Sequence, residues 1–419
     1  MKNKSIVFLL LLGYGIIFCE VKNLILMIGD GMGLAITDLA RIIIVGKDQY
    51  LNFEKFPVVG IVKTYSDESL VTDSAAAATA MSCGVKTKNS FLGLTTDGVV
   101  VENLVEKIKK TGRTVGLVTT VTITHATPAG FAVHINSRDE KQVAKQYVEL
   151  KNVDVLLGGG RYLSVYTKEF INAGYTVVTT RDELLSLDTK LVTKLTGLFN
   201  DIDSVYYIDK NFLQRDDIPS LSELSKTAIE VLSKNKKGFF LLIEAGRIDW
   251  ACHDNDAATA INEIKEFDDA VAMVVETIKQ KKLLQDTLII ITSDHETGGL
   301  SLGTGEYRFY PEKISKQKIS IKKIGEELKG QPKEIIIQKF EEYTGIADLT
   351  EEEILQISKG NRKEISRIIS SRAEIGWSTS VHSGMSVPIY AMGKNSEIFS
   401  GVYDNTDIFK KIIQVMNLK

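Results

Sequence analysis

The sequence has 419 residues but only five histidines, and three of these lie in short segments with acids, serine or glycine. In one segment Asp249 precedes His253 by four residues, and in another Asp294 directly precedes His295. On a helix, a spacing of four places two side chains on one face, where both can bind one metal ion. The third histidine, His382, lies in the segment Thr-Ser-Val-His-Ser-Gly. Imidazole and carboxylate ligands without thiolates are typical of catalytic sites for zinc or similar ions.

Two further acids stand at the ends of apolar runs. Glu244 ends one run five residues before Asp249, and Asp30 lies in a Gly-Asp-Gly turn after another run. Taken alone, each of these segments is equally typical of an ordinary turn or a hydrogen-bonded loop. Their shared position after apolar runs, together with the three histidines, is what indicates a common site.

Ser74 stands before a run of alanines, the strongest helix formers, in the segment Thr-Asp-Ser-Ala-Ala-Ala-Ala. The pattern predicts that a helix begins here, with Ser74 either as its N-cap or as a nucleophile at its positive end. The small residues that follow would let a phosphate approach the first N–H groups of the helix. Two more residues suit such a site, because the Thr127 hydroxyl can bind a hard cation and the Arg138 guanidinium can bind two phosphate oxygens.

The elements that must position these side chains are short apolar runs, each followed by a helical pattern. Near-continuous apolar strands that alternate with helices predict an α/β fold, with a large, mostly parallel central sheet and helices on both faces. In such sheets the ligand lies beyond the carboxyl ends of the strands, which is where the acids and histidines stand. The clearest runs are residues 24–28, 115–119, 153–157, 238–243 and 287–292.

One stretch departs from this alternation of strands and helices. Residues 310–372 are rich in Lys, Glu and Ile at helical spacing, with charges of both signs interspersed. Such a pattern is usual for helices that keep one face in solvent. It predicts a helical insertion between two core strands, within a single domain of residues 20–419.

The composition excludes several classes of protein. Lys and Arg number 51 against 54 Asp and Glu, a net charge of −3, so the chain has no electrostatic signature of a nucleic-acid-binding surface. Hydrophobic residues make up 44% and charged residues 25%, as in globular proteins and unlike disordered ones. Three cysteines are too few for a disulfide framework, so Cys83 and Cys252 are expected to be free, packed thiols.

The first residues resemble an export signal, because Lys2 and Lys4 precede an uncharged apolar run over residues 6–18. That run is too short for a membrane-spanning helix, which needs about 20 residues. Residues 1–19 are therefore predicted to be the signal peptide of a periplasmic or extracellular protein, with no transmembrane helix in the mature chain. Lipid attachment at Cys19 is the alternative, which the bulky Phe18 disfavours.

Seen together, these segments are similar to the alkaline phosphatase family in sequence and in order. The similarity covers nearly the whole chain after the predicted signal, and it is lowest around residues 310–372. The segments that carry it are LILMIGDGMG, VTDSAAAATAMSCGVKT, THATPAGFAVHINSR, DVLLGGGR, GFFLLIEAGRIDWACHDNDA, TSDHETGG and HSGMSVPIYAMG.

This resemblance implies a secreted, metal-dependent phosphomonoesterase that acts on phosphate monoesters, and a chain that forms homodimers. It implies that Ser74 is the nucleophile that becomes phosphorylated and that Arg138 binds the phosphate. It also implies two zinc ions and one magnesium ion, with alkaline pH favouring activity because protons compete with metals for the ligands. The implied ligands are Asp249, His253 and His382 for one zinc, Asp30, Asp294 and His295 for the other, and Asp30, Thr127 and Glu244 for magnesium.

Two residues near these ligands depart from the pattern of some family members. This chain has His125 where some members have an acid that helps to hold magnesium, and Trp250 where some have a cation that helps to hold phosphate. The resemblance therefore implies weaker binding of magnesium and of phosphate, and our hypothesis is that the second change permits faster release of the product.

Two alternatives remain open at this point. A phosphodiesterase or phosphonate hydrolase could use the same two-metal scaffold, although Arg138 and a third metal site favour a monoester. A non-catalytic phosphate- or metal-binding protein is the other alternative. It is disfavoured because Ser74 and the whole ligand set are present.

Overall fold

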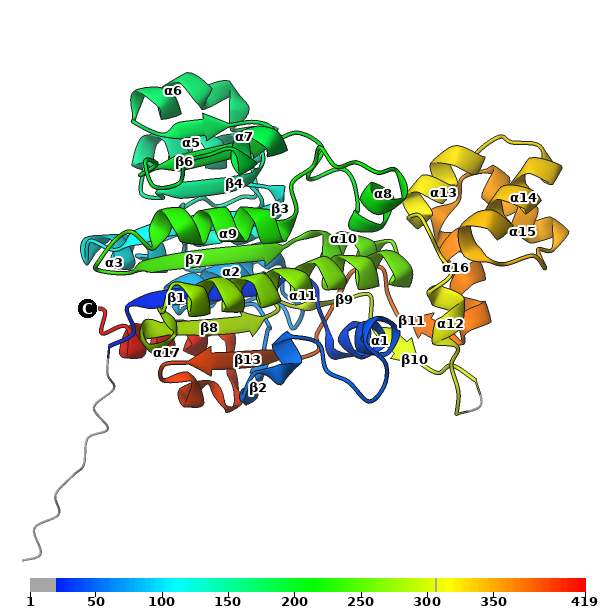
Figure 1. Cartoon of the computed structure of the whole chain (residues 1–419). Helices are drawn as coiled ribbons and strands as arrows, with labels where there is room; N and C mark the ends of the chain where they lie inside the picture. The colour runs from blue at the N-terminus through cyan, green and yellow to red at the C-terminus, as the bar shows by residue number, and fades with distance from the viewer. Residues whose placement is uncertain (1–19, 306) are drawn as a thin grey trace, which may run out of the picture.

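The computed structural model describes residues 20–305 and 307–419, and the predicted signal peptide and Cys19 lie outside these residues. In the described chain a ten-stranded sheet forms the centre of the molecule (Figure 1). The prediction of a large, mostly parallel sheet is confirmed, and only β13 runs antiparallel to its neighbours. The strands in spatial order are β14 (Gly401–Asp404), β2 (Val58–Lys63), β13 (Val387–Gly393), β8 (Thr287–Thr292), β1 (Asn23–Gly29), β7 (Phe239–Ala245), β3 (Thr114–Thr122), β4 (Val155–Gly159), β6 (Leu195–Phe199) and β5 (Thr176–Val178).

Helices cover both faces of this sheet and bury its apolar strands. Along β1, Ile25 and Met27 belong to one hydrophobic cluster and Leu24, Leu26 and Ile28 to the other, as the alternation of side chains requires. Because all seven residues of β1 are buried, its sequence is a continuous apolar run. One face packs against α1 (Leu34–Ile44), α9 (Leu221–Leu232) and α11 (Ala257–Gln280), and the other against α2 (Ser74–Cys83), α3 (Leu104–Lys110), α5 (Glu140–Leu150) and α17 (Asn405–Val415).

Shorter helices follow individual strands or connect the larger ones. Directly after β7 comes α10 (Arg247–His253), which lies at the carboxyl end of the parallel strands (Figure 1). The other short helices are α4 (Ala126–Gly130), α6 (Thr167–Asn172), α7 (Arg181–Leu185) and α8 (Tyr207–Phe212). Among the described residues, no helix combines the length and the hydropathy that crossing a membrane requires.

A group of helices projects from the same end of the sheet as α10 and is drawn in yellow and orange in Figure 1. It leaves the core after β10 (Leu300–Leu302) and returns through β11 (Ile375–Trp377), and these two strands pair with each other. Just outside this pair, β9 (Glu296–Thr297) pairs with β12 (His382–Ser383). The group, hereafter the helical segment, comprises α12 (Pro311–Ile314), α13 (Ile321–Leu328), α14 (Lys333–Thr344), α15 (Glu351–Ser358) and α16 (Arg362–Ala373).

The helix that begins at Ser74 packs closely against the short helix α4. A Cβ atom added to Gly130 would lie 2.6 Å from the Cβ of Ala78, which is far inside normal contact distance. Small residues at both positions therefore let the two helices approach, and this approach fixes α2 relative to the strand end that precedes α4. The alanine run of α2 thus serves packing as well as helix formation.

We predict that Gly130→Ala lowers the free energy of unfolding by about 1–3 kcal/mol, although alanine is the better helix former, because the added methyl group overpacks the contact. The measurement is chemical denaturation of both proteins. As a control, Gly130→Ala combined with Ala78→Gly should recover part of this loss. Strictly additive costs in that double-mutant cycle would rule out the close contact as the cause.

Candidate active site

Ser74 is the first residue of α2, and the cap of this helix is its neighbour. The Asp73 carboxylate accepts a hydrogen bond from the Ala76 amide at 2.9 Å, which is the work of an N-cap. The Ser74 hydroxyl is therefore free of the capping role that the sequence left open, and it is 1% exposed. Its Oγ lies 3.2 Å from Nε2 of His295, so a hydroxyl at the positive end of a helix faces an imidazole.

Three neighbouring strands supply the acids of the site. In the sheet β1 lies between β7 and β8, and Gly29 at the end of β1 pairs with Ala245 at the end of β7. The residues at or just after these ends are Asp30, Glu244 and Asp294, and all three are buried. The register of the parallel strands thus brings Asp30 together with two carboxylates that lie more than 200 positions later in the sequence.

The ligand atoms of these acids and of the histidines form three compact groups. In each group, one ligand atom from every residue lies within 4.8 Å of the corresponding atoms of the others. Asp30 and His295 each belong to two groups, so the three groups form one continuous cluster. We name them the Asp294 group (Asp30, Asp294 and His295), the Asp249 group (Asp249, His295 and His382) and the Glu244 group (Asp30, His125 and Glu244).

Two of the expected ligands, His253 and Thr127, are not members of these groups of acids and histidines. His253 lies on α10 one turn after Asp249, and its Nε2 is 3.2 Å from Oδ2 of Asp249. Its ring centroid is 5.1 Å from that of His382, which stacks on His295 at 3.5 Å. Thr127 is fully buried on α4, two residues after His125 of the Glu244 group.

The cluster contains several buried polar atoms that no hydrogen bond satisfies among the described residues. Such atoms are costly unless something pairs with them, and here they belong to the residue types that bind hard or borderline cations. A set of oxygen and imidazole donors, crowded and unpaired, fits metal ions. The atoms are both carboxylate oxygens of Asp30, Oδ2 of Asp294, Oε1 of Glu244, Nδ1 of His125 and Oγ1 of Thr127.

Electrostatics at the cluster reflect this crowding of acids. Burial, together with the charges of Asp294, Asp249 and Glu244, raises the pKa of Asp30 well above its ordinary value. Burial and the neighbouring His295 lower the pKa of His382 to about 4. Cations placed among these groups would reverse the repulsion that raises the pKa of Asp30.

Arg138 lies at the rim of the cluster, with a partly exposed side chain. Its Nη1 is 3.5 Å from Oδ2 of Asp73, and its Nη2 is 3.3 Å from Nε2 of His125. Trp250 contacts His125 edge to face, with ring centroids 6.1 Å apart. The guanidinium therefore stands between Asp73, at the helix start, and His125 of the Glu244 group.

Two supporting residues were missed by the sequence analysis. Asp73 orients both the α2 start and Arg138, and the N-cap pattern before the alanine run was the signal that could have found it. Thr297 is 1% exposed, and its hydroxyl lies 2.5 Å from Oδ1 of Asp249 and 3.2 Å from Nδ1 of His295. Its position two residues after His295 in Ser-Asp-His-Glu-Thr was the only hint of this role.

Thr297 holds one ligand from each of two groups through a single hydroxyl. If the hydroxyl donates to Asp249, it can accept from Nδ1–H of His295, and this fixes the tautomer in which Nε2 is free. That Nε2 is the atom facing Ser74, Asp30 and Asp294. Thr297 thus supports the geometry of the cluster without offering a ligand.

The sequence is similar to those of known proteins over nearly its whole length. Residues 21–418 match the sequence model of the family described as alkaline phosphatase. The chain belongs to the alkaline phosphatase family. Alkaline phosphatase 3 of Bacillus subtilis is 37% identical, over 95% of this chain and 89% of its own length. The chain is accordingly an enzyme of the phosphoric monoester hydrolase class. Its membership of the family favours this activity over the diesterase and the non-catalytic alternatives.

Solved structures of the family share the fold. The cold-active alkaline phosphatase of a psychrophilic Shewanella is 33% identical, with a TM-score of 0.84 over 94% of this chain and 99% of that one. A histidine-to-aspartate variant of alkaline phosphatase from the Antarctic bacterium TAB5 is 29% identical, with a TM-score of 0.69 over 96% of this chain and 99% of that one. That variant holds magnesium in a site called M3.

We predict that Thr297→Val lowers the affinity of the cluster for its metal ions by about 10- to 100-fold, because two ligands lose their orienting partner. Thr297→Ser keeps the hydroxyl and should bind metal as the unaltered enzyme does. Metal retention is measured by elemental analysis after dialysis against graded concentrations of a chelator. Equal retention by Thr297→Val and Thr297→Ser would contradict the assigned role.

Proposed function

We propose that this enzyme is exported and hydrolyses phosphate monoesters through a phosphoserine at Ser74, with two zinc ions and one magnesium ion as cofactors. The observation that carries the proposal is the Ser74 hydroxyl, which is buried, relieved of capping by Asp73 and 3.2 Å from a histidine of the metal cluster. Export rests on the pattern predicted for residues 1–19.

The donor sets suit three cations. Asp249, His253 and His382 would hold one zinc, while Asp30, Asp294 and His295 would hold the second. Oxygen donors suit magnesium, and Asp30, Thr127 and Glu244 offer them at the third position. When bound, such cations supply positive charge at the attacking and leaving oxygens of an in-line displacement.

The chain's own residues then have defined tasks. Arg138 binds two oxygens of the phosphate and holds the phosphorus in line with Ser74. The Ser74 Oγ forms a bond to phosphorus as its proton passes to solvent, the bond to the ester oxygen breaks, and the leaving oxygen takes a proton from water. A water molecule then attacks the same phosphorus, the bond from phosphorus to Oγ breaks, and Oγ takes a proton from that water, so inorganic phosphate leaves and the Ser74 hydroxyl is restored.

We predict that Ser74→Ala lowers kcat for an aryl phosphate on the order of 10³-fold or more, because the covalent step is lost. Ser82→Ala, in the same helix, should retain activity, since the Ser82 hydroxyl contacts the Gly130 carbonyl and not the cluster. Labelled phosphate should be trapped on the unaltered enzyme after an acid quench, and not on Ser74→Ala. Turnover by Ser74→Ala at the normal rate would refute the covalent role.

His125 offers a histidine at the Glu244 group, where its Nδ1 is 3.8 Å from Oε1 of Glu244. Imidazole is a poorer ligand than carboxylate for magnesium. The magnesium bound by the aspartate variant of the TAB5 enzyme is consistent with that preference, which we extend to this chain.

We predict that His125→Asp strengthens magnesium binding about tenfold or more, because a third carboxylate joins those of Asp30 and Glu244. Titration of magnesium into the zinc-loaded enzyme measures the change. His125→Asn is the matched control and should give a smaller gain, since its oxygen is neutral. Weaker binding by His125→Asp than by the unaltered enzyme would show that His125 does not adjoin the magnesium position.

A further inference from the structure

The helical segment is inserted between two candidate ligands of the cluster. Its entry follows His295 through β9 and β10, and its exit leads through β11 and β12 to His382. At the base of the segment Gly298 lies against Trp377, where a Cβ would be 2.6 Å from the indole ring. The two ends of the helical segment are therefore directly connected, along the chain, to His295 and His382 of the cluster.

The helical segment also contacts the turn that follows Asp249 and His253 in the chain. Residues 254–256, hereafter the elbow, connect α10, which carries Asp249 and His253, to the long helix α11. The elbow turns sharply, and Asn255 adopts a left-handed conformation with φ of 52°. Its position directly after His253 means that a shift of the elbow would move the imidazole.

Asp256 anchors the elbow to the start of α13. Its carboxylate is 1% exposed and accepts hydrogen bonds from the Ile321 amide at 2.7 Å and from the Gln317 side chain at 2.9 Å. It also caps α11 by accepting from the Thr259 amide and hydroxyl. One buried carboxylate thus joins the starts of two helices, one in the core and one in the helical segment.

Asn255 is held from two sides. Its carbonyl accepts a hydrogen bond from the Ser366 hydroxyl of α16 at 2.7 Å. Its side-chain amide donates to the Thr379 carbonyl at 3.1 Å, on the chain that leaves the segment toward His382. The neighbouring Asp254 lies 3.7 Å from Arg362, at the start of α16.

The same returning chain orients the imidazole of His253. Nδ1 of His253 is 2.7 Å from the Ser380 carbonyl, so this nitrogen carries the proton and donates it. Nε2 is then left free toward Asp249, at 3.2 Å. A carbonyl contact of this kind fixes the ring orientation and the tautomer of a metal-binding histidine.

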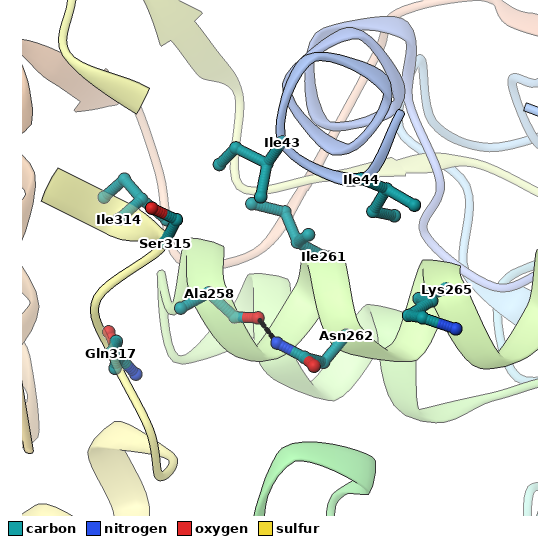
Figure 2. A pocket seen from close by; sticks show the side chains of 9 residues that line it. All are labelled: Ile43, Ile44, Ala258, Ile261, Asn262, Lys265, Ile314, Ser315 and Gln317. Atoms are coloured by element: carbon teal, nitrogen blue, oxygen red, sulfur yellow. Dashed lines mark hydrogen bonds between the residues drawn. The ribbon is translucent and has the colours of Figure 1, made fainter. Parts of the chain in front are cut away.

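Away from the elbow, the contact between the segment and the core is less complete. A cavity of about 250 Å³ lies between α1, α11 and the chain around α12, lined by Ile43, Ile261 and Gln317 among others (Figure 2). Continuous packing therefore does not fix the position of the helical segment against α1 and α11. The polar contacts of the elbow fix its position instead.

We propose that the helical segment is a clamp that positions Asp249 and His253 for their metal ion, acting through Asp256 and Ser366. The inference rests on the proposed function, because it assumes that these two residues bind zinc. Asp256 and Ser366 are positioning residues, since neither offers an atom to the cluster. In this clamp the helical segment holds the elbow, and the elbow holds Asp249 and His253. These two residues then lie beside His295 and His382, which the segment connects along the chain.

The test measures zinc retention and thermal unfolding of the purified enzyme and four variants. Burial raises the pKa of Asp256 to about 6, so it is charged at pH 8, where Asp256→Asn removes that charge. Ser366→Ala removes one hydroxyl contact and leaves the fold intact. Both variants should release one zinc at about tenfold lower chelator concentration than the unaltered enzyme and keep the other. Ser366→Thr, which keeps the hydroxyl, should restore retention.

Glu353→Gln is the matched control for a general loss of stability. Hydrogen bonds from Arg372 lower the pKa of Glu353 to about 2, so this variant also replaces a charged, bonded carboxylate by an amide. The pair joins α15 to α16 and does not contact the elbow. Glu353→Gln should lower the unfolding temperature and leave zinc retention unchanged.

The outcomes separate the clamp from the proposed function. Loss of one zinc in Asp256→Asn and Ser366→Ala, with retention in Ser366→Thr and Glu353→Gln, supports the clamp. Unchanged retention in Ser366→Ala, or equal loss in Glu353→Gln, overturns it, whether or not Asp256→Asn folds. If the unaltered enzyme hydrolyses no phosphate ester and retains no zinc, the proposed function itself is wrong.

Discussion

The burial of mutually repelling carboxylates at one edge of the sheet is the constraint on which the rest of the structure depends. Asp30 is fully buried and close to Asp294, Asp249 and Glu244, and neither of its oxygens has a hydrogen-bond partner among the described residues. Such a cluster is unfavourable in itself, because uncompensated buried charge costs several kcal/mol. Cations turn the same crowding into attraction, so folding of this edge and metal binding are coupled.

The backbone meets this constraint with parallel strands and close approaches. Parallel pairing places the ends of β7, β1 and β8 side by side, so the acids at or just after these ends converge. Gly31 adopts φ of +70°, and a Cβ there would lie 2.9 Å from the Cα of Asp249. The turn after β1 can therefore approach α10 only with glycine at this position, which explains the Gly-Asp-Gly pattern.

The sequence predicted the parts of the site that depend on strand ends, and it failed where tertiary contacts decide. The apolar runs indicated the sheet, and the structure brings most of the acids and histidines after them into one cluster. Periodicity carries no information about Thr297, whose hydroxyl matters only because two distant segments meet there. The role of Ser74, as helix cap or as nucleophile, was left open for the same reason. Either the Asp73 carboxylate or the Ser74 hydroxyl could have capped the helix.

The cluster has a core half, which contains Asp30 and His295, and a peripheral half, which contains His253 and His382. Different parts of the chain hold these two halves in place. His295 and Asp30 have no exposed side-chain surface, whereas the side chain of His253 is 35% exposed and that of His382 is 12% exposed. The core half is held by strands that are buried on both faces, so its geometry follows from the sheet. The peripheral half lies where the sheet ends, and a metal position there needs support from another part of the chain. The helical segment projects from this end, and its contacts with the turn after His253 supply the support that the sheet does not.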